Sequence, residues 1–88
     1  LQPMIANVAR IIGIEWLAAA QGIDFLRPLA SSPALEEAHA LLRRDCPAMM
    51  TDRYLAPDIE AAAAHVQRGS LTRIRRALPA LPVLWRAA

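Results

Sequence analysis

The first part of the chain carries a wide run of apolar positions interrupted by few polar residues. At about 100° per residue, the polar side chains fall on one side of a helix. The pattern predicts a helix from about Pro3 to Gln21, which Gly22 ends in a left-handed conformation. Its apolar residues are Met4, Ile5, Val8, Ile11, Ile12, Trp16, Ala19 and Ile23, and its polar residues are Gln2, Asn7, Arg10, Gln21 and Asp24. Such a helix must be buried over most of its circumference.

Two further helices are predicted from signals at their ends. Ser32 is suited to cap a helix that begins at Pro33 and ends before Pro47, and the segment before it, 23–32, is predicted as a connector. A second connector, 48–56, leads to a helix that Pro57 opens and Gly69 closes. The apolar stripes are Leu35, Ala38, Leu41 and Leu42 on the first, and Ile59, Ala62, Ala63 and Val66 on the second. The small side chains of the second stripe allow a neighbouring helix to approach closely.

A short amphipathic helix is predicted from Ser70 to Leu78, where prolines then stop it. Residues 1–78 are thus expected to form a helical scaffold segment, and residues 79–88 a loose tail. No strand pattern and no internal repeat is visible. The prediction is an all-α chain of three to four helices that forms part of a larger helical bundle.

Chain length and composition favour a partner surface. A chain of 88 residues buries only about 60 to 65% of its unfolded surface, which makes it marginal alone. Hydrophobic residues make up 56% of the sequence but aromatic residues only 5%, so most apolar side chains are those of helix-forming Ala and Leu. The first residue is Leu1 and no clear N-terminal cap precedes the first helix, which indicates a fragment cut inside an element.

Other features of the composition favour a soluble cytoplasmic protein. No run approaches the roughly 20 apolar residues of a membrane span, because Glu15 and Asp24 interrupt the first helix. Cys46 is the only cysteine, so neither an internal disulfide nor a paired-cysteine zinc site can form. A reducing compartment fits this usage.

Positive charge is concentrated near the C-terminus. The net charge is only +2, but residues 68–88 contain no acidic residue and five arginines: Arg68, Arg73, Arg75, Arg76 and Arg86. This patch can meet phosphate, nucleic acid or an anionic membrane. A protein interface or a solvated tail is favoured, because lysine and interleaved aromatic side chains are missing.

Glu15 is the most unusual titratable residue, since it falls on the apolar side of the first helix. A buried carboxylate with a raised pKa can act as a general acid or base. The favoured interpretation is a carboxylate paired with an arginine or a helix end of a neighbouring element, and the catalytic interpretation remains the alternative.

The remaining candidate residues suggest no site. His39 lies at the edge of the inward stripe of its helix and His65 on the outer part of the next, a spacing that matches no metal-ligand pattern. A nucleophile pair of Cys46 and His39 is conceivable, but helix geometry separates them by roughly 10 Å, so a buried thiol is favoured. No phosphate loop, nucleophile elbow or zinc motif is present. The sequence therefore assigns no catalytic, cofactor-binding or metal-binding residue.

Blocks of sequence over most of the chain carry a resemblance to a known family. These blocks are NVARIIGIEWLAAAQGIDF at Asn7–Phe25, SSPALEEAHALLR at Ser31–Arg43, DRYLAPDIEAA at Asp52–Ala62 and GSLTRI at Gly69–Ile74. In this order they resemble the C-terminal segment of the histidine ammonia-lyases, members of the aromatic amino acid ammonia-lyase family. After Ile74 the chain departs from the family's usual tail.

The resemblance implies an enzyme of histidine catabolism, a cytoplasmic all-helical homotetramer that converts L-histidine to trans-urocanate and ammonia. It also implies a methylidene-imidazolone cofactor made from an Ala-Ser-Gly tripeptide, which this chain lacks. None of the family's functional residues maps onto this chain, and Tyr54 occupies a position often held by Phe. We therefore interpret the chain as a scaffold part that is not catalytic alone, with the rest of the enzyme, or a second copy, as partner. A stand-alone helical module that binds a protein or nucleic acid through its basic tail is the alternative.

Overall fold

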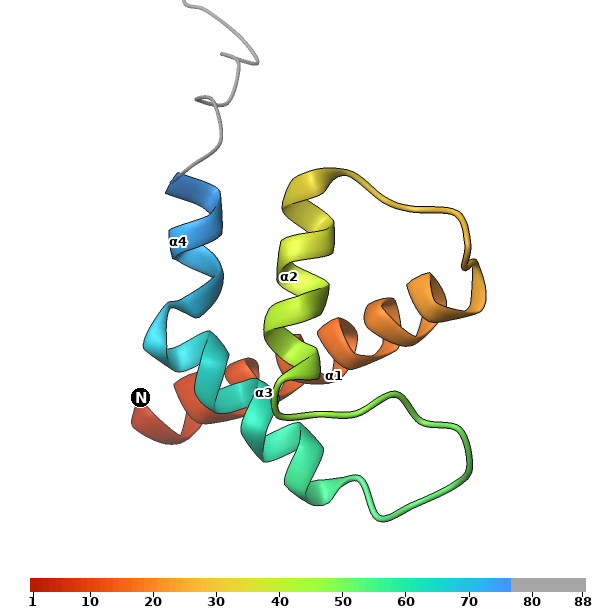
Figure 1. Ribbon diagram of the computed structural model, residues 1–88. Helices are drawn as coiled ribbons and strands as arrows, with labels where there is room; N and C mark the ends of the chain where they lie inside the picture. Colours follow the sequence, from red (N-terminus) through yellow and green to blue (C-terminus); the bar gives the residue numbers. More distant parts are fainter. Residues whose placement is uncertain (77–88) are drawn as a thin grey trace, which may run out of the picture.

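A computed structural model describes residues 1–76, which contain four helices and no strand (Figure 1). The helices are α1 (Gln2–Phe25), α2 (Pro33–Arg43), α3 (Ala56–Arg68) and α4 (Ser70–Arg76). The all-α prediction is confirmed for these residues. The expected loose tail at 79–88 and the predicted end of the fourth helix at Leu78 lie outside the described residues.

Local signals fix the start of α2 and the end of α3 as the sequence predicts. The Ser32 hydroxyl accepts a hydrogen bond from the Leu35 N–H at 3.3 Å, and Pro33 is the first residue of α2. Gly69 ends α3 with a φ of 75°, in the left-handed region that favours glycine. These boundaries are confirmed.

The predicted end of α1 at Gly22 is wrong. The helix continues through Gly22 to Phe25, and Gly22 does not have a positive φ. A glycine inside a helix costs only about 1 kcal/mol relative to alanine, so tertiary contacts can outweigh its preference for a helix end. Asp24, in the added turn, is held by His39 and Arg43 of α2.

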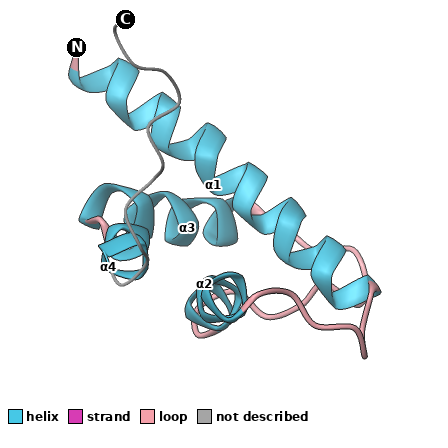
Figure 2. Cartoon of the chain, turned by 90° about the horizontal axis from the view of Figure 1, so that it is seen from above, coloured by secondary structure: helices cyan, strands magenta, loops and turns pink. Residues whose placement is uncertain are grey.

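The close packing of α1 against α3 organises the fold (Figure 2). At Gly13 the two backbones approach so closely that a Cβ atom would lie 3.1 Å from the Ala63 nitrogen and 3.2 Å from the Ala62 Cβ. Ala62 and Ala63 are both buried. The expectation that the small residues of α3 admit a close neighbour is therefore confirmed.

A small core joins α1, α3 and the end of α2. Leu42 and Cys46 have no exposed surface, and Ala20 and Ala62 complete the buried cluster. Trp16 of α1 packs against it. Figure 1 shows α2 and α4 standing beside each other and across α1. The core is therefore small for a chain of this length, and much apolar surface stays outside it.

Burial of α1 is much narrower than its sequence pattern requires. Its buried residues are Ala9, Gly13 and Ala20. Large apolar side chains of the same helix are exposed, namely Met4, Ile5, Val8, Ile11, Ile12 and Ile14. The expectation of burial over most of the circumference is not met by this chain, because its other helices cover only one side of α1.

Candidate functional site

Polar residues of α1 contact the chain's own helices and connectors beside the buried Ala9, Gly13 and Ala20. Arg10 forms an ion pair with Glu60 of α3 at 2.7 Å. Gln21 makes two hydrogen bonds with the backbone of Met49, accepting from its N–H at 3.1 Å and donating to its carbonyl at 2.9 Å. Arg10 and Gln21 of the polar stripe are therefore used for contacts within the chain, whereas Gln2 and Asn7 of that stripe are exposed.

The apolar side of α1 points outward. We call Met4, Ile5, Val8, Ile11 and Ile12 the outer face of α1; all five side chains are exposed. By helical geometry, Glu15 follows Ile11 and Ile12 by one turn and lies on the same face. A run of exposed large apolar side chains along one helix face is typical of an interaction site.

Glu15 is exposed, contrary to the expected burial. Among residues 1–76 it has neither a hydrogen-bond nor an ion-pair partner. The expected pairing with an arginine is therefore not made within the described part of the chain. Its position on the apolar side of α1 agrees with the sequence pattern.

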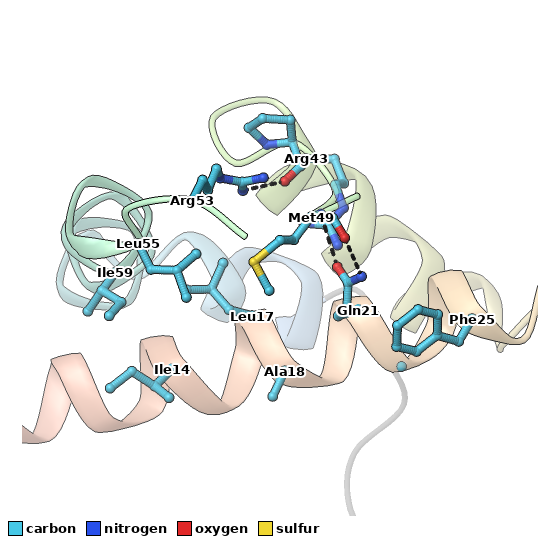
Figure 3. A pocket seen from close by; sticks show the side chains of 12 residues that line it. Ile14, Leu17, Ala18, Gln21, Phe25, Arg43, Met49, Arg53, Leu55 and Ile59 are labelled. Carbon is cyan, nitrogen blue, oxygen red and sulfur yellow. Dashed lines mark hydrogen bonds between the residues drawn. The ribbon is translucent and has the colours of Figure 1, made fainter. Parts of the chain in front are cut away.

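An apolar pocket of about 410 Å³ lies beside α1, next to the connector that precedes α3 (Figure 3). Its walls are mostly hydrophobic side chains, including Ile14, Leu17, Phe25, Met49, Leu55 and Ile59. Two arginines also line it, but Arg43 pairs with Asp24 and Arg53 with Asp58. The pocket can therefore take apolar groups. Sequence reasoning missed it because its walls come from segments far apart in the chain.

Asp24 ties the end of α1 to α2 and is the centre of an ionic cluster with His39 and Arg43. Its two carboxylate oxygens contact His39 Nε2 at 2.8 Å and Arg43 Nη2 at 2.6 Å. Desolvation acts to raise the Asp24 pKa, but the hydrogen bonds and charges of Arg43 and His39 outweigh it, so the pKa lies below 3.8. The contact with Asp24 gives His39 a structural role in joining α2 to α1.

Acid is expected to weaken the fold through Asp24 and Glu36. Hydrogen bonds from Arg27 and from the Ser31 N–H lower the pKa of Glu36 from 4.5 to about 2. Both pKa values are lower in the folded state, so this stabilisation is present above pH 4.5 and is lost as the pH falls towards 2. We expect the thermal unfolding midpoint to fall over that range.

Variants at two acidic positions test this dependence. Glu36→Gln should flatten the decline between pH 4.5 and about 2, measured by circular dichroism. Asp52→Asn, at an exposed position in the connector before α3, is the matched control and should leave the decline unchanged. An identical decline in Glu36→Gln and the unmodified protein would contradict the prediction.

His65 is buried, at 7% exposure, so its predicted position on the outer part of α3 is wrong. Its Nδ1 lies 3.1 Å from Arg68 Nη2, and a guanidinium only donates, so Nδ1 accepts. The Nε2–H then donates to Asp45 Oδ2 at 2.6 Å. Trp16 contacts the ring edge-on, with centroids 5.9 Å apart. The α2–α3 connection and α1 together bury a residue that helix periodicity alone placed outside.

Cys46 is a buried thiol, as expected. Burial raises its pKa, and the charges of Asp58 and Asp45 raise it further. A thiol with a raised pKa is a poor nucleophile. No group of His, Cys, Asp and Glu residues suited to a metal ion occurs among the described residues.

The arginines near the C-terminus are distributed over two settings. Arg68 contacts His65, while Arg73 and Arg76 are exposed on α4. Arg86 lies outside the described residues. The side chain of Tyr54 is 81% exposed, in the connector before α3.

By length and composition alone, α1 is able to cross a membrane. The prediction from the sequence that no segment approaches the length of a membrane span is not supported for α1. The core helix of a soluble protein satisfies the same criterion, so this finding does not identify a membrane protein.

The fold and its exposed surfaces define an all-α packing segment, in which the small residues of α1 face the other helices and its large apolar side chains face outward. The chain is 49% identical over 74 residues to the histidine ammonia-lyase of Salmonella choleraesuis (strain SC-B67). The match covers 84% of this chain but only 15% of that relative. The chain is therefore homologous to a segment of a histidine ammonia-lyase, as its sequence blocks indicate. No family model and no solved structure matches it.

Proposed function

We propose that this chain is a scaffold segment of a histidine ammonia-lyase and takes no direct part in the elimination of ammonia from L-histidine. The observation that carries this proposal is the 49% identity to that enzyme over 84% of the chain. The exposed outer face of α1 supports it, since a segment cut out of a larger helical bundle leaves such a face uncovered.

The proposed role is to complete the helical bundle that holds the active site. The Ala-Ser-Gly tripeptide that would form the methylidene-imidazolone is absent from these 88 residues, so the cofactor and the catalytic residues would come from other parts of the polypeptide. In this proposal the whole enzyme is an oligomer, and the rest of its chain covers the outer face of α1.

We further propose that α1 is a core helix of a soluble cytoplasmic enzyme. Three ionisable side chains support this, because Arg10, Glu15 and Asp24 are spread along the helix. A charged side chain at the centre of a bilayer costs at least about 2.5 kcal/mol, and Glu15 lies near the middle of α1.

An assay of urocanate formation tests the proposal. The natural full-length gene product is expected to convert L-histidine to a product with the ultraviolet absorbance of urocanate, and the isolated 88 residues are expected to form none. As a control within the full-length protein, Tyr54→Phe should leave kcat unchanged, because this exposed side chain has no catalytic role in the proposal.

Two results would contradict the proposal. Urocanate formed by the 88 residues alone would show that they contain the active site. A gene product that begins near Leu1 and forms a stable soluble oligomer without urocanate formation would instead support an independent helical interaction module.

A further inference from the structure

We propose that the outer face of α1 docks against another helix of the same enzyme, which carries an apolar stripe and one arginine or lysine opposite Glu15. This inference rests on the proposed function and adds to it the chemistry of the partner surface.

Glu15 lies within the apolar surface that the partner would cover. On a helix, residues three and four apart are neighbours, so Ile11 and Ile12 flank Glu15 on one side, and Ala18 and Ala19 on the other. The Ile11 side chain is 57% exposed and that of Val8, one turn earlier, is 53% exposed. A partner that buries these side chains also removes Glu15 from water.

A carboxylate removed from water is best stabilised by an arginine or lysine, which supplies both positive charge and hydrogen-bond donors, whereas a helix end supplies only a partial charge. An isolated buried carboxylate is strongly disfavoured, and buried charges in proteins are paired. Three arginines on or beside α1 are already engaged: Arg10 with Glu60, Arg27 with Glu36, and Arg43 with Asp24. The cation opposite Glu15 therefore comes from outside the described residues.

A second copy of α1 does not fit this requirement. The outer face of α1 contains no basic side chain, so two such faces would bury two carboxylates without a cation. The midpoint of Gln2–Phe25 lies between residues 13 and 14. Antiparallel pairing about that midpoint would place the two Glu15 positions within about 4.5 Å of each other along the axis, where like charges repel.

The remaining polypeptide is long enough to supply the partner helix. The chain spans only 15% of the Salmonella relative, so most of an enzyme of that length lies outside these residues. An apolar helix with one cation matches the outer face in both hydrophobicity and charge. The geometry points to this occupant.

Photo-cross-linking in the full-length gene product tests the identity of the partner. A p-benzoylphenylalanine in place of Ile11 is expected to cross-link to a peptide from another part of the same polypeptide, with an arginine or lysine within one helical turn of the linked residue. The same photoreactive residue in place of Glu37, which is exposed on α2, is the matched control and should not label that peptide. A cross-link to α1 of a second copy, to a segment without a cation, or to no protein segment would overturn the proposal.

Charge exchange tests the pairing. Glu15→Lys is expected to lower the Tm of the full-length protein by at least about 5 °C, and Glu37→Lys by less than about 1 °C. Changing the arginine or lysine near the cross-linked residue to glutamate in the Glu15→Lys protein should restore most of the lost Tm. If the Glu15→Lys protein does not fold, the readout is whether the added change of the cation to glutamate recovers folded protein. If it recovers none, the proposed ion pair of Glu15 is wrong.

The two proposals fail in different ways. If the full-length protein forms urocanate but Ile11 cross-links to a second copy, the docking inference is wrong and the proposed function stands. If no urocanate is formed but the helix with the arginine or lysine is labelled, the assignment to a histidine ammonia-lyase is wrong. The docking of the outer face of α1 against that helix is then still supported.

Discussion

Replacing Leu42 with alanine is expected to lower the free energy of unfolding by about 2 to 5 kcal/mol. Leu42 has no exposed surface and lies in the cluster formed with Ala20, Cys46 and Ala62. Three of these four residues have small side chains, so they cannot fill the space that the leucine leaves. Urea denaturation of the full-length protein, followed by circular dichroism, measures the loss.

A volume-conserving change at the same position is the control. Leu42→Met keeps the site filled, and such exchanges cost less than about 1.5 kcal/mol. A similar loss of stability in both variants would mean that leucine's shape, rather than the cavity, accounts for the effect. Full stability of Leu42→Ala would show that the cluster is not the core of this segment.

Replacing Gly13 with leucine is expected to lower the free energy of unfolding by about 3 kcal/mol. A Cβ atom at this position already lies 3.1 Å from the Ala63 backbone nitrogen, and backbone cannot move aside as a flexible side chain can. The larger side chain must therefore push α1 away from α3 and open their contact. Chemical denaturation of the full-length protein checks the size of the effect.

The second glycine of α1 provides a control with the opposite sign. A Cβ atom at Gly22 meets nothing within 4 Å, and the residue is helical. Gly22→Ala should therefore raise the free energy of unfolding by about 0.5 to 1 kcal/mol, because alanine favours the helix. Destabilisation by Gly22→Ala would mean that α1 is not continuous at Gly22 or that a helix outside these residues packs against it, and unchanged stability in Gly13→Leu would contradict the close α1–α3 approach.

Gly22 and His65 show where sequence reasoning about this chain was wrong. Helix-end signals predicted that Gly22 ends α1, but the contacts of Asp24 with α2 extend the helix by one turn. Periodicity placed His65 on the outside of α3, but Asp45, Arg68 and Trp16 surround its ring. In both cases residues distant in sequence supplied interactions that a local pattern does not contain.

For Glu15 the sequence predicted the helix face but not the burial of the side chain. Its position on the apolar side of α1 followed from periodicity alone, because helical spacing fixes which residues share a face. The exposure of Glu15 did not follow from periodicity, because burial depends on which surface covers that face of α1. The pocket beside α1 was likewise invisible in the sequence, as Ile14 and Leu55 approach each other only in the folded chain.

The sequence by itself determined the all-α class, the cap at Ser32, the end of α3 at Gly69 and the homology to a histidine ammonia-lyase segment. These depend on local backbone preferences and on residue identity. Only the tertiary structure decided that α1 packs inward through Ala9, Gly13 and Ala20 and leaves its large apolar side chains facing outward. The physical reason is that Arg10, Gln21 and Asp24 find hydrogen-bond and ionic partners within the chain, whereas the surface that would cover Val8 and Ile11 is not among the described residues.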